Sequence, residues 1–178
     1  MLTTRIATIP VPYHIRAKAY DFDREISKLK SSFNSTNYLN KYSHGISKIG
    51  EWLFAMTFGM EDCIDWTVNY GGDESSDFIV NGIKIDIKTS TYDRFPDLKC
   101  YPHECYSDVY VLATYNSVMK AGTLVGFISK AKLFDQSNYR NYRGLGNRYA
   151  VKGCDLCHDW ARLRHYLDSK KTLSAVTH

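Results

Sequence analysis

Apolar and polar residues alternate along residues 77–89, and this pattern predicts a β-hairpin. Asn81-Gly82 is a strong signal for a two-residue type I′ turn, which needs positive φ at both central positions. A turn closed there pairs Val80 with Ile83 and places Asp77 opposite Asp86. One face is then wholly apolar and must meet a core, and it consists of Phe78, Val80, Ile83, Ile85 and Ile87. The other face carries Asp77, Asp86 and Lys88.

Helical periodicity precedes this hairpin. Residues 15–33 place an apolar side chain every three or four positions, which is typical of an amphipathic helix. A second helix is expected from about Gly45 to Phe58, ended by Gly59, and it is apolar almost all round. This second helix should therefore be central, whereas residues 1–14, which contain two prolines, are expected to form an extended arm.

Further strands are expected over residues 64–70, 108–115 and 123–128. The segment 108–115 is β-branched, aromatic and nearly free of charge, which is typical of a strand buried on both faces. Ser129 is placed to cap a short helix that begins at Lys130, and a last helix is expected over residues 155–167. Helices around a strand-rich centre indicate a three-layer α/β sandwich with a central mixed β-sheet.

Bulk properties fit one domain of 178 residues. Apolar content of 44% and charged content of 24% are ordinary for a globular protein, and the net charge of +4 is compatible with a polyanion partner. The sequence contains no long uninterrupted apolar stretch and no signal-peptide pattern at its N-terminus, so we expect a cytoplasmic protein without a membrane partner.

The polar face of the hairpin is the first candidate for chemistry. Two opposed carboxylates, Asp77 and Asp86, repel each other unless they share a proton or a cation. Mg²⁺ or Mn²⁺ would suit them, because hard divalent ions take one or two carboxylates and leave other positions to water and phosphate oxygens. Lys88 could then orient or deprotonate a metal-bound water, or balance the charge of a phosphate. The alternative is an ordinary surface hairpin whose polar side faces water.

This arrangement resembles the core of the PD-(D/E)XK nuclease superfamily. Asp77, eight intervening residues and then Asp86-Ile87-Lys88 match the family's pattern, with Ser76 where the name of the family has proline. The resemblance covers about residues 45–128, so the helix at 15–33 and the region 129–178 are additions to the core. It implies a restriction-endonuclease-like fold and hydrolysis that leaves a 5′ phosphate and a 3′ hydroxyl. It also implies that Asp77, Asp86, Glu51 and the carbonyl of Ile87 hold the metal.

Glu51 lies in the second predicted helix, away from the main apolar stripe of that helix. Its neighbours on the same face include Lys48 and Phe54, so this carboxylate is either paired with the lysine or functional. Gly50-Glu51 resembles the acidic helix of the same superfamily, whose Glu reaches the metal site. Both interpretations stay open at this stage.

Residues 138–149 alternate arginine with tyrosine, and their glycines indicate a flexible loop. Arginine contacts phosphate, and tyrosine stacks on bases or lines the backbone groove. A nucleic-acid contact is therefore expected from Arg140, Arg143, Arg148, Tyr139, Tyr142 and Tyr149. A merely solvated basic loop is the alternative.

The five cysteines are an odd number, which argues against a closed disulfide framework. Two groups contain the ingredients of a tetrahedral zinc site, namely Cys100, His103 and Cys105, and Cys154, Cys157 and His158. Cys63 is left over and is expected to be a core thiol. An iron–sulfur cluster and unligated thiols are the other possibilities.

The sequence thus predicts a metal-dependent nuclease, with a DNA endonuclease of restriction, repair or junction-resolving type as the leading interpretation. The rival interpretation is a catalytically inactive, zinc-stabilised nucleic-acid-binding protein. The sequence does not separate DNA from RNA, a monomer from a homodimer, or a cellular protein from a viral one that would act in the host cytoplasm.

Overall fold

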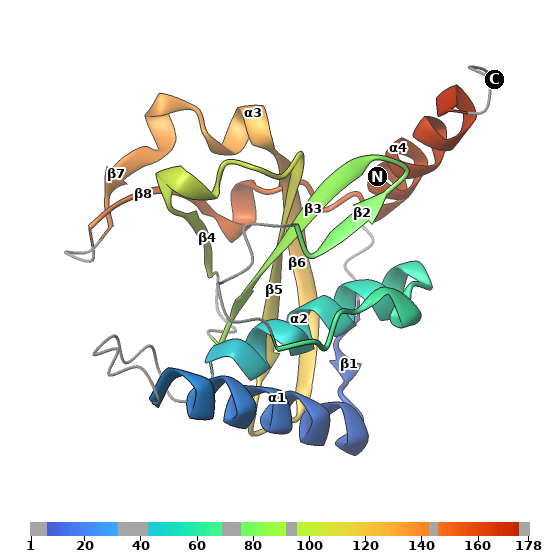
Figure 1. The fold of residues 1–178 in the computed structure, drawn as a ribbon. Helices are drawn as coiled ribbons and strands as arrows, with labels where there is room; N and C mark the ends of the chain where they lie inside the picture. The colour runs from blue at the N-terminus through green and yellow to red at the C-terminus, as the bar shows by residue number, and fades with distance from the viewer. Residues whose placement is uncertain (1–6, 32–42, 69–75, 92–95, 143–145, 175–178) are drawn as a thin grey trace.

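A computed structural model describes residues 7–31, 43–68, 76–91, 96–142 and 146–174 (Figure 1). The fold is mixed α/β and is built on a five-stranded sheet with the order β1-β6-β5-β3-β2. Its strands are β1 (Ile9–Pro10), β2 (Phe78–Val80), β3 (Ile83–Ser90), β5 (Val109–Asn116) and β6 (Ala121–Ser129). Only β3 and β5 run parallel among the neighbours in this sheet, so the predicted mixed sheet is confirmed.

A second, three-stranded antiparallel sheet was not predicted from the sequence. It has the order β4-β8-β7 and consists of β4 (Asp97–Cys100), β7 (Tyr139–Asn141) and β8 (Asn147–Lys152). The Arg/Tyr-rich segment that we expected to be a flexible loop is therefore largely a β-hairpin, in which Arg140 pairs with Arg148. The pairing of residues 97–100 with residues 149–152 fixes this hairpin in place.

The longer helices are α1 (Tyr13–Ser31), α2 (Ser43–Phe58) and α4 (Trp160–Ser174), and α3 (Lys130–Leu133) is a single turn. Short 3₁₀ turns are η1 (Glu61–Cys63), η2 (Pro102–Glu104), η3 (Gln136–Asn138) and η4 (Gly153–Asp155). Helix α2 lies between α1 and the large sheet (Figure 1). Asp23 of α1 accepts hydrogen bonds from the backbone N–H groups of His44 and Gly45, which satisfies the first turn of α2 from a neighbouring helix.

Each face of the large sheet has its own core. One face packs against α2 and α4, and its buried residues include Leu53, Phe54, Ile85, Val111 and Leu163. The other face packs against the small sheet, and its buried residues include Leu98, Tyr110, Leu112, Leu133 and Val151. Helices α2 and α4 therefore cover one side of the large sheet, and the small sheet covers the other side.

The hairpin prediction is confirmed in its register. Phe78 pairs with Ile85 and Val80 pairs with Ile83, around a turn in which Asn81 and Gly82 both have positive φ, at 50° and 81°. The prediction for the central strand is also confirmed, because every residue of β5 except Asn116 is buried.

Residues 64–68 form no strand, so the strand predicted over 64–70 is wrong in the part that the structure describes. The backbone N–H of Thr67 donates to the carboxylate of Asp65 at 2.8 Å. Such a local side-chain bond competes with a strand partner for the backbone. Residues 69 and 70 lie outside the described residues.

Both ends of the chain also differ from expectation. Helix α1 begins at Tyr13 rather than Ile15, and Ile9–Pro10 pairs with β6 as a short strand. The last helix begins at Trp160 rather than Asp155, because the carboxylate of Asp159 accepts the N–H of Arg162 and caps the helix there. Just before that cap, Cys157 exchanges two backbone hydrogen bonds with Phe127 of β6.

None of the described helices is long and apolar enough to cross a membrane.

Candidate functional site

Lys88 joins two carboxylates beside β3. Its Nζ lies 3.2 Å from Oδ2 of Asp86 in the same strand and donates to Oε1 of Glu104 at 2.9 Å. Asp86 is only 4% exposed, and alternation along β3 places it on the same face as Lys88. The predicted Asp86–Lys88 pair is thus a buried, charged cluster rather than the polar side of a hairpin that faces water.

Asp77 completes this strand edge. Its Oδ2 accepts the backbone N–H of Ile87 at 2.6 Å, so the carboxylate takes the place of a strand partner just beyond the end of β2. Because the pairs Val80–Ile83 and Phe78–Ile85 exchange hydrogen bonds in a two-residue hairpin, the Ile87 N–H and C=O both point toward the β2 side. The carbonyl predicted as a ligand therefore points to the side on which Asp77 lies.

Glu51 reaches the same region from α2. It is 4% exposed, and its Oε2 accepts a hydrogen bond from Lys48 Nζ at 2.8 Å. The sequence left open whether Glu51 is paired or functional, and the structure shows the pairing with Lys48. It also brings Glu51 close enough to Asp77 and Asp86 to interact with both electrostatically.

A glycine permits this approach of α2 to the sheet. A Cβ on Gly50 would overlap the side chain of Thr89 in β3. Because Gly50 directly precedes Glu51, this close packing sets how near the Glu51 carboxylate comes to the acidic residues of the strand edge.

The pKa values of the carboxyl groups reflect burial and mutual repulsion. Burial raises the pKa of Glu51 to about 7, although Lys48 opposes the rise, and Asp65 and Asp86 add to it. Burial, Glu51 and Asp86 together raise the pKa of Asp77 well above its ordinary value. Burial also raises the pKa of Asp86, against the opposing effect of Lys88. Additional positive charge at this site would relieve all three shifts.

The charge on Lys88 is held in place by its neighbours. Burial alone would lower its pKa, but Asp86, with a further contribution from Glu104, holds the pKa above its ordinary value. Lys88 is therefore an ammonium group at neutral pH, suited to balancing negative charge rather than to accepting a proton.

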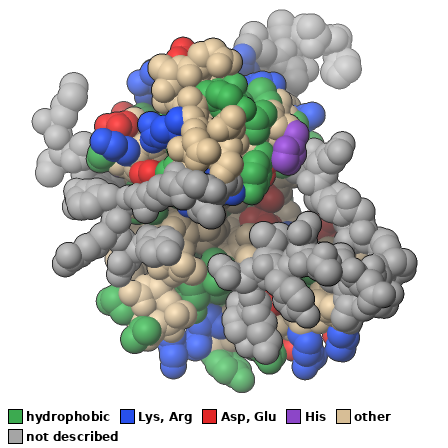
Figure 2. Space-filling model, turned by 90° about the vertical axis from the view of Figure 1, so that its left-hand side faces the viewer, with side chains coloured by type: hydrophobic (Ala, Val, Ile, Leu, Met, Phe, Trp, Pro, Cys, Tyr) green, Lys and Arg blue, Asp and Glu red, His purple; other side chains and the backbone are tan. Residues whose placement is uncertain are grey.

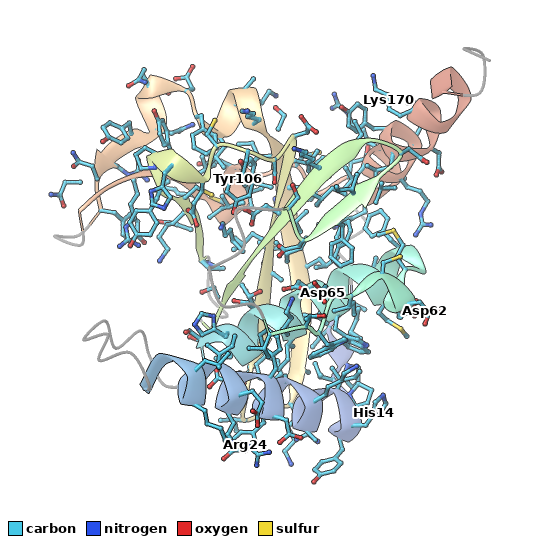
Figure 3. The ribbon with its side chains drawn as sticks, in the orientation of Figure 1. His14, Arg24, Asp62, Asp65, Tyr106 and Lys170 are labelled. Atoms are coloured by element: carbon cyan, nitrogen blue, oxygen red, sulfur yellow. The ribbon has the colours of Figure 1, made fainter. Side chains whose placement is uncertain are left out.

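Tyr106 lies beside these groups, on the segment between η2 and β5 (Figure 3). Burial raises its pKa to about 12, with a further contribution from Asp86, so its hydroxyl remains a hydrogen-bond donor at neutral pH. Asp65 lies alongside α2 in the same view. Figure 2 shows acidic side chains set back between the upper and lower parts of one face.

The donors present suit a hard divalent cation. Carboxylate and carbonyl oxygens are the ligands that Mg²⁺ and Mn²⁺ prefer, and burial together with mutual repulsion raises the pKa of all three carboxyl groups. Within the described residues, however, no three His, Cys, Asp or Glu side chains already stand together as a ligand set. Glu51 and Asp86 are instead paired with Lys48 and Lys88.

Glu104 and Tyr106 were missed by the sequence reasoning. Glu104 lies between His103 and Cys105, inside the segment interpreted as half of a zinc site. The turn of η2 brings it to Lys88, and its backbone carbonyl also accepts the hydroxyl of buried Tyr110 at 2.6 Å. The motif already has two carboxylates for one lysine, so its charges gave no signal for a third carboxylate beside Lys88.

The cysteines occupy different environments. Cys100 is buried, and its pKa is raised chiefly by burial, with Cys105 close enough to add a small contribution. Cys154 is exposed, with its Sγ 3.7 Å from the carboxylate of Asp155, and Cys157 lies beside β6. Cys63 is exposed, so the prediction that it is a core thiol is wrong. Zinc binding by Cys100, His103, Cys105, Cys154 and Cys157 stays a prediction.

The basic and aromatic residues gather around the small sheet. Arg140 and Arg148 are cross-strand partners, and so are Tyr139 and Tyr149, whose rings lie 4.9 Å apart. Tyr142 is buried and donates to Asp97 at 3.0 Å, so its hydroxyl has a structural role. Arg143 lies outside the described residues. Two arginines side by side repel each other unless they share an anion, which is a property of phosphate-binding surfaces.

Comparison with known proteins found no matching family model, no matching curated protein and no matching solved structure.

Proposed function

We propose that this protein is a metal-dependent nuclease that hydrolyses phosphodiester bonds in DNA. The observation that carries the proposal is the convergence of Glu51, Asp77 and Asp86, three mutually repelling carboxylates of which Glu51 and Asp86 are buried, with the ammonium group of Lys88 at their edge. Such a cluster costs folding free energy, and perturbed acidic groups of this kind concentrate at functional sites.

The fold we propose for this function is restriction-endonuclease-like. In support, the mixed sheet carries Asp86 and Lys88 on a strand that belongs to the predicted hairpin, and a helix against the sheet carries Glu51. Asp77, Asp86, Glu51 and the Ile87 carbonyl would hold Mg²⁺ or Mn²⁺. When bound, such an ion lowers the pKa of its water and polarises the scissile phosphate.

The other roles in this mechanism fall to individual side chains of the cluster. Lys88 is held charged, so it would balance the negative charge that develops on the phosphate. Glu51 would act as a metal ligand, because a bound cation would lower its raised pKa and keep the carboxylate ionised. Glu104 would position Lys88 through the 2.9 Å hydrogen bond between them. The adjacent basic strands β7 and β8 would contact the DNA backbone.

A second candidate is a catalytically inactive nucleic-acid-binding protein. The pairing of Glu51 and Asp86 with lysines favours it, because these ion pairs could neutralise the cluster without any metal. Metal-dependent cleavage separates the two functions.

The test is an assay of plasmid, single-stranded and four-way-junction DNA with Mg²⁺, Mn²⁺ or EDTA. We expect cleavage that EDTA abolishes, and Asp86→Asn and Lys88→Ala should each reduce it by about a hundredfold or more, which corresponds to about 3 kcal/mol of lost transition-state stabilisation. Asp108→Asn is the control carboxylate substitution, because Asp108 is exposed and accepts the backbone N–H of Lys84 at 2.9 Å. Wild-type rates in Asp86→Asn, or cleavage that persists in EDTA, would exclude the proposed mechanism.

A further inference from the structure

Three planar groups are stacked on the surface next to the carboxylate cluster. The rings of Tyr101 and His103 have centroids 5.3 Å apart and planes within 14° of parallel. The guanidinium carbon of Arg148 lies 4.3 Å from the centre of the Tyr101 ring, and its Nη2 donates to the Tyr101 hydroxyl at 2.7 Å. Tyr101 is 40% exposed and His103 is exposed, so this stack presents flat surface to solvent.

The stack is held by two regular elements rather than by one loop. Tyr101 directly follows β4, His103 lies in η2, and Arg148 comes from β8, which pairs with β4. The cation holds the aromatic ring in a fixed orientation, so the flat surface is ordered before any ligand arrives. A preorganised surface loses less conformational entropy on binding than a mobile one.

One carboxylate connects the stack to the proposed catalytic lysine. Oε2 of Glu104 accepts the backbone N–H of Tyr101 at 2.6 Å, while Oε1 accepts Lys88 Nζ at 2.9 Å. The backbone of Tyr101 is therefore linked to Lys88 through a single side chain. The position of Tyr101 and the position of Lys88 are set by the same group.

We propose that the Tyr101–His103–Arg148 stack binds an unpaired nucleotide next to the scissile phosphate. This inference rests on the proposed function and names its substrate class, which is a strand with unpaired bases, as at a flap, a bulge or a single-stranded end. Aromatic rings and guanidinium planes stack on bases of any sequence, and Arg148 adds positive charge for the neighbouring phosphate. Bases inside a duplex already stack on both sides, so an unpaired base is better placed to extend this stack than a paired one.

The experiment measures binding separately from cleavage. Fluorescence anisotropy in EDTA compares single-stranded DNA, single-stranded RNA and a blunt duplex, and a 2-aminopurine base reports stacking by loss of its fluorescence. For Tyr101→Leu and His103→Ala we expect single-strand affinity to fall by about tenfold, with duplex affinity changed less than about twofold. Tyr101→Phe keeps the ring and should retain single-strand affinity and the fluorescence loss.

Tyr166→Leu is the matched control, because Tyr166 is also 40% exposed and has a cation, Lys170, near its ring. Equal losses for single strand and duplex, no loss in either stack variant, or an equal loss in Tyr166→Leu would overturn the inference. If Tyr101→Leu does not fold, His103→Ala decides alone, because its side chain is exposed. Cleavage with Mg²⁺ is scored in parallel, so a protein that binds unpaired bases without cutting would contradict the proposed nuclease and not the stack. The DNA and RNA arms identify which unpaired strand is preferred.

Discussion

Gly50 of α2 lies directly against Thr89 of β3, and no Cβ fits between them. Among the described residues the buried Thr89 hydroxyl has no hydrogen-bond partner, so this contact is one of close packing rather than of bonding. Its effect is to bring the next residue, Glu51, toward the carboxylates at the edge of the sheet. This contact thus sets the spacing between α2 and the large sheet next to the candidate site.

Gly50→Ala should therefore damage both stability and activity. The added methyl group must push α2 away from β3, and overpacking of this kind costs about 1–3 kcal/mol. We expect chemical denaturation to show that loss and the cleavage rate to fall with it. Thr89→Ala in the same chain should restore part of both, because it removes two of the three side-chain atoms that the methyl group meets. Additive effects of the two substitutions would contradict the direct contact.

The raised pKa of Glu51 predicts a pH-dependent stability. A carboxyl group whose pKa rises on folding, here from 4.5 to about 7, binds its proton more tightly in the native state. The free energy of unfolding should then fall as the pH rises through that interval, by an amount on the order of 3 kcal/mol. Urea denaturation at pH 5 and pH 7.5 in EDTA measures the fall, and Glu51→Gln should flatten it. A wild-type stability that stays level or increases over this range is the contrary result.

A metal ion should reverse the cost of the clustered carboxylates. In millimolar Mg²⁺ or Mn²⁺ we expect a higher melting temperature than in EDTA, since a ligand at a hundred times its Kd stabilises by about 2.7 kcal/mol. Asp77→Asn should raise the stability of the metal-free protein, because it removes repulsion while its amide oxygen can still accept the Ile87 N–H. The same variant should lose the response to metal, whereas Asp108→Asn should keep it. An unresponsive wild-type protein counts against the site.

Local patterns allowed the hairpin, the buried strand β5 and the face of β3 to be predicted, because alternation and the Asn81-Gly82 turn act within a few residues. Glu104 could not be predicted, because its position depends on the pairing of β4 with β8 across about fifty residues. Those two strands are short, and their cysteine and arginine residues pointed to chemistry rather than to a sheet. The strand predicted over 64–70 is wrong in its described part for the opposite reason, since one aspartate bonds the backbone locally.

Arg140 should contribute binding and not chemistry. It lies in β7 beside Arg148, and a phosphate contact there would release counterions from the nucleic acid. Arg140→Ala should weaken binding to all sequences alike and lower the salt slope by about one, as measured by titration at several salt concentrations. Arg24→Ala is the control, because that arginine lies on α1 with Asp21 as its partner. An unchanged salt slope in Arg140→Ala would mean that β7 does not touch the backbone.

Zinc remains to be tested by elemental analysis. If the groups around Cys100 and Cys154 share an ion, protein purified without chelator should contain about one zinc per chain. Structural zinc binding contributes free energy on the order of 10 kcal/mol to folding, so Cys154→Ser should lower the melting temperature markedly. Cys63→Ser, another exposed thiol, should have little effect. Less than half an equivalent of zinc, together with freely titrating thiols, would remove this site.

The pairing of β4 with β8 also has a consequence for biosynthesis. Asp77, Asp86 and Lys88 leave the ribosome well before residues 147–152, the strand that secures β4 and the turn carrying Glu104. A nascent chain that ends before β8 therefore has the hairpin but lacks the sheet that holds the partner of its lysine. Assembly of the charged cluster therefore requires the C-terminal third of the chain, and a product truncated before β8 would lack the sheet that places Glu104 beside Lys88.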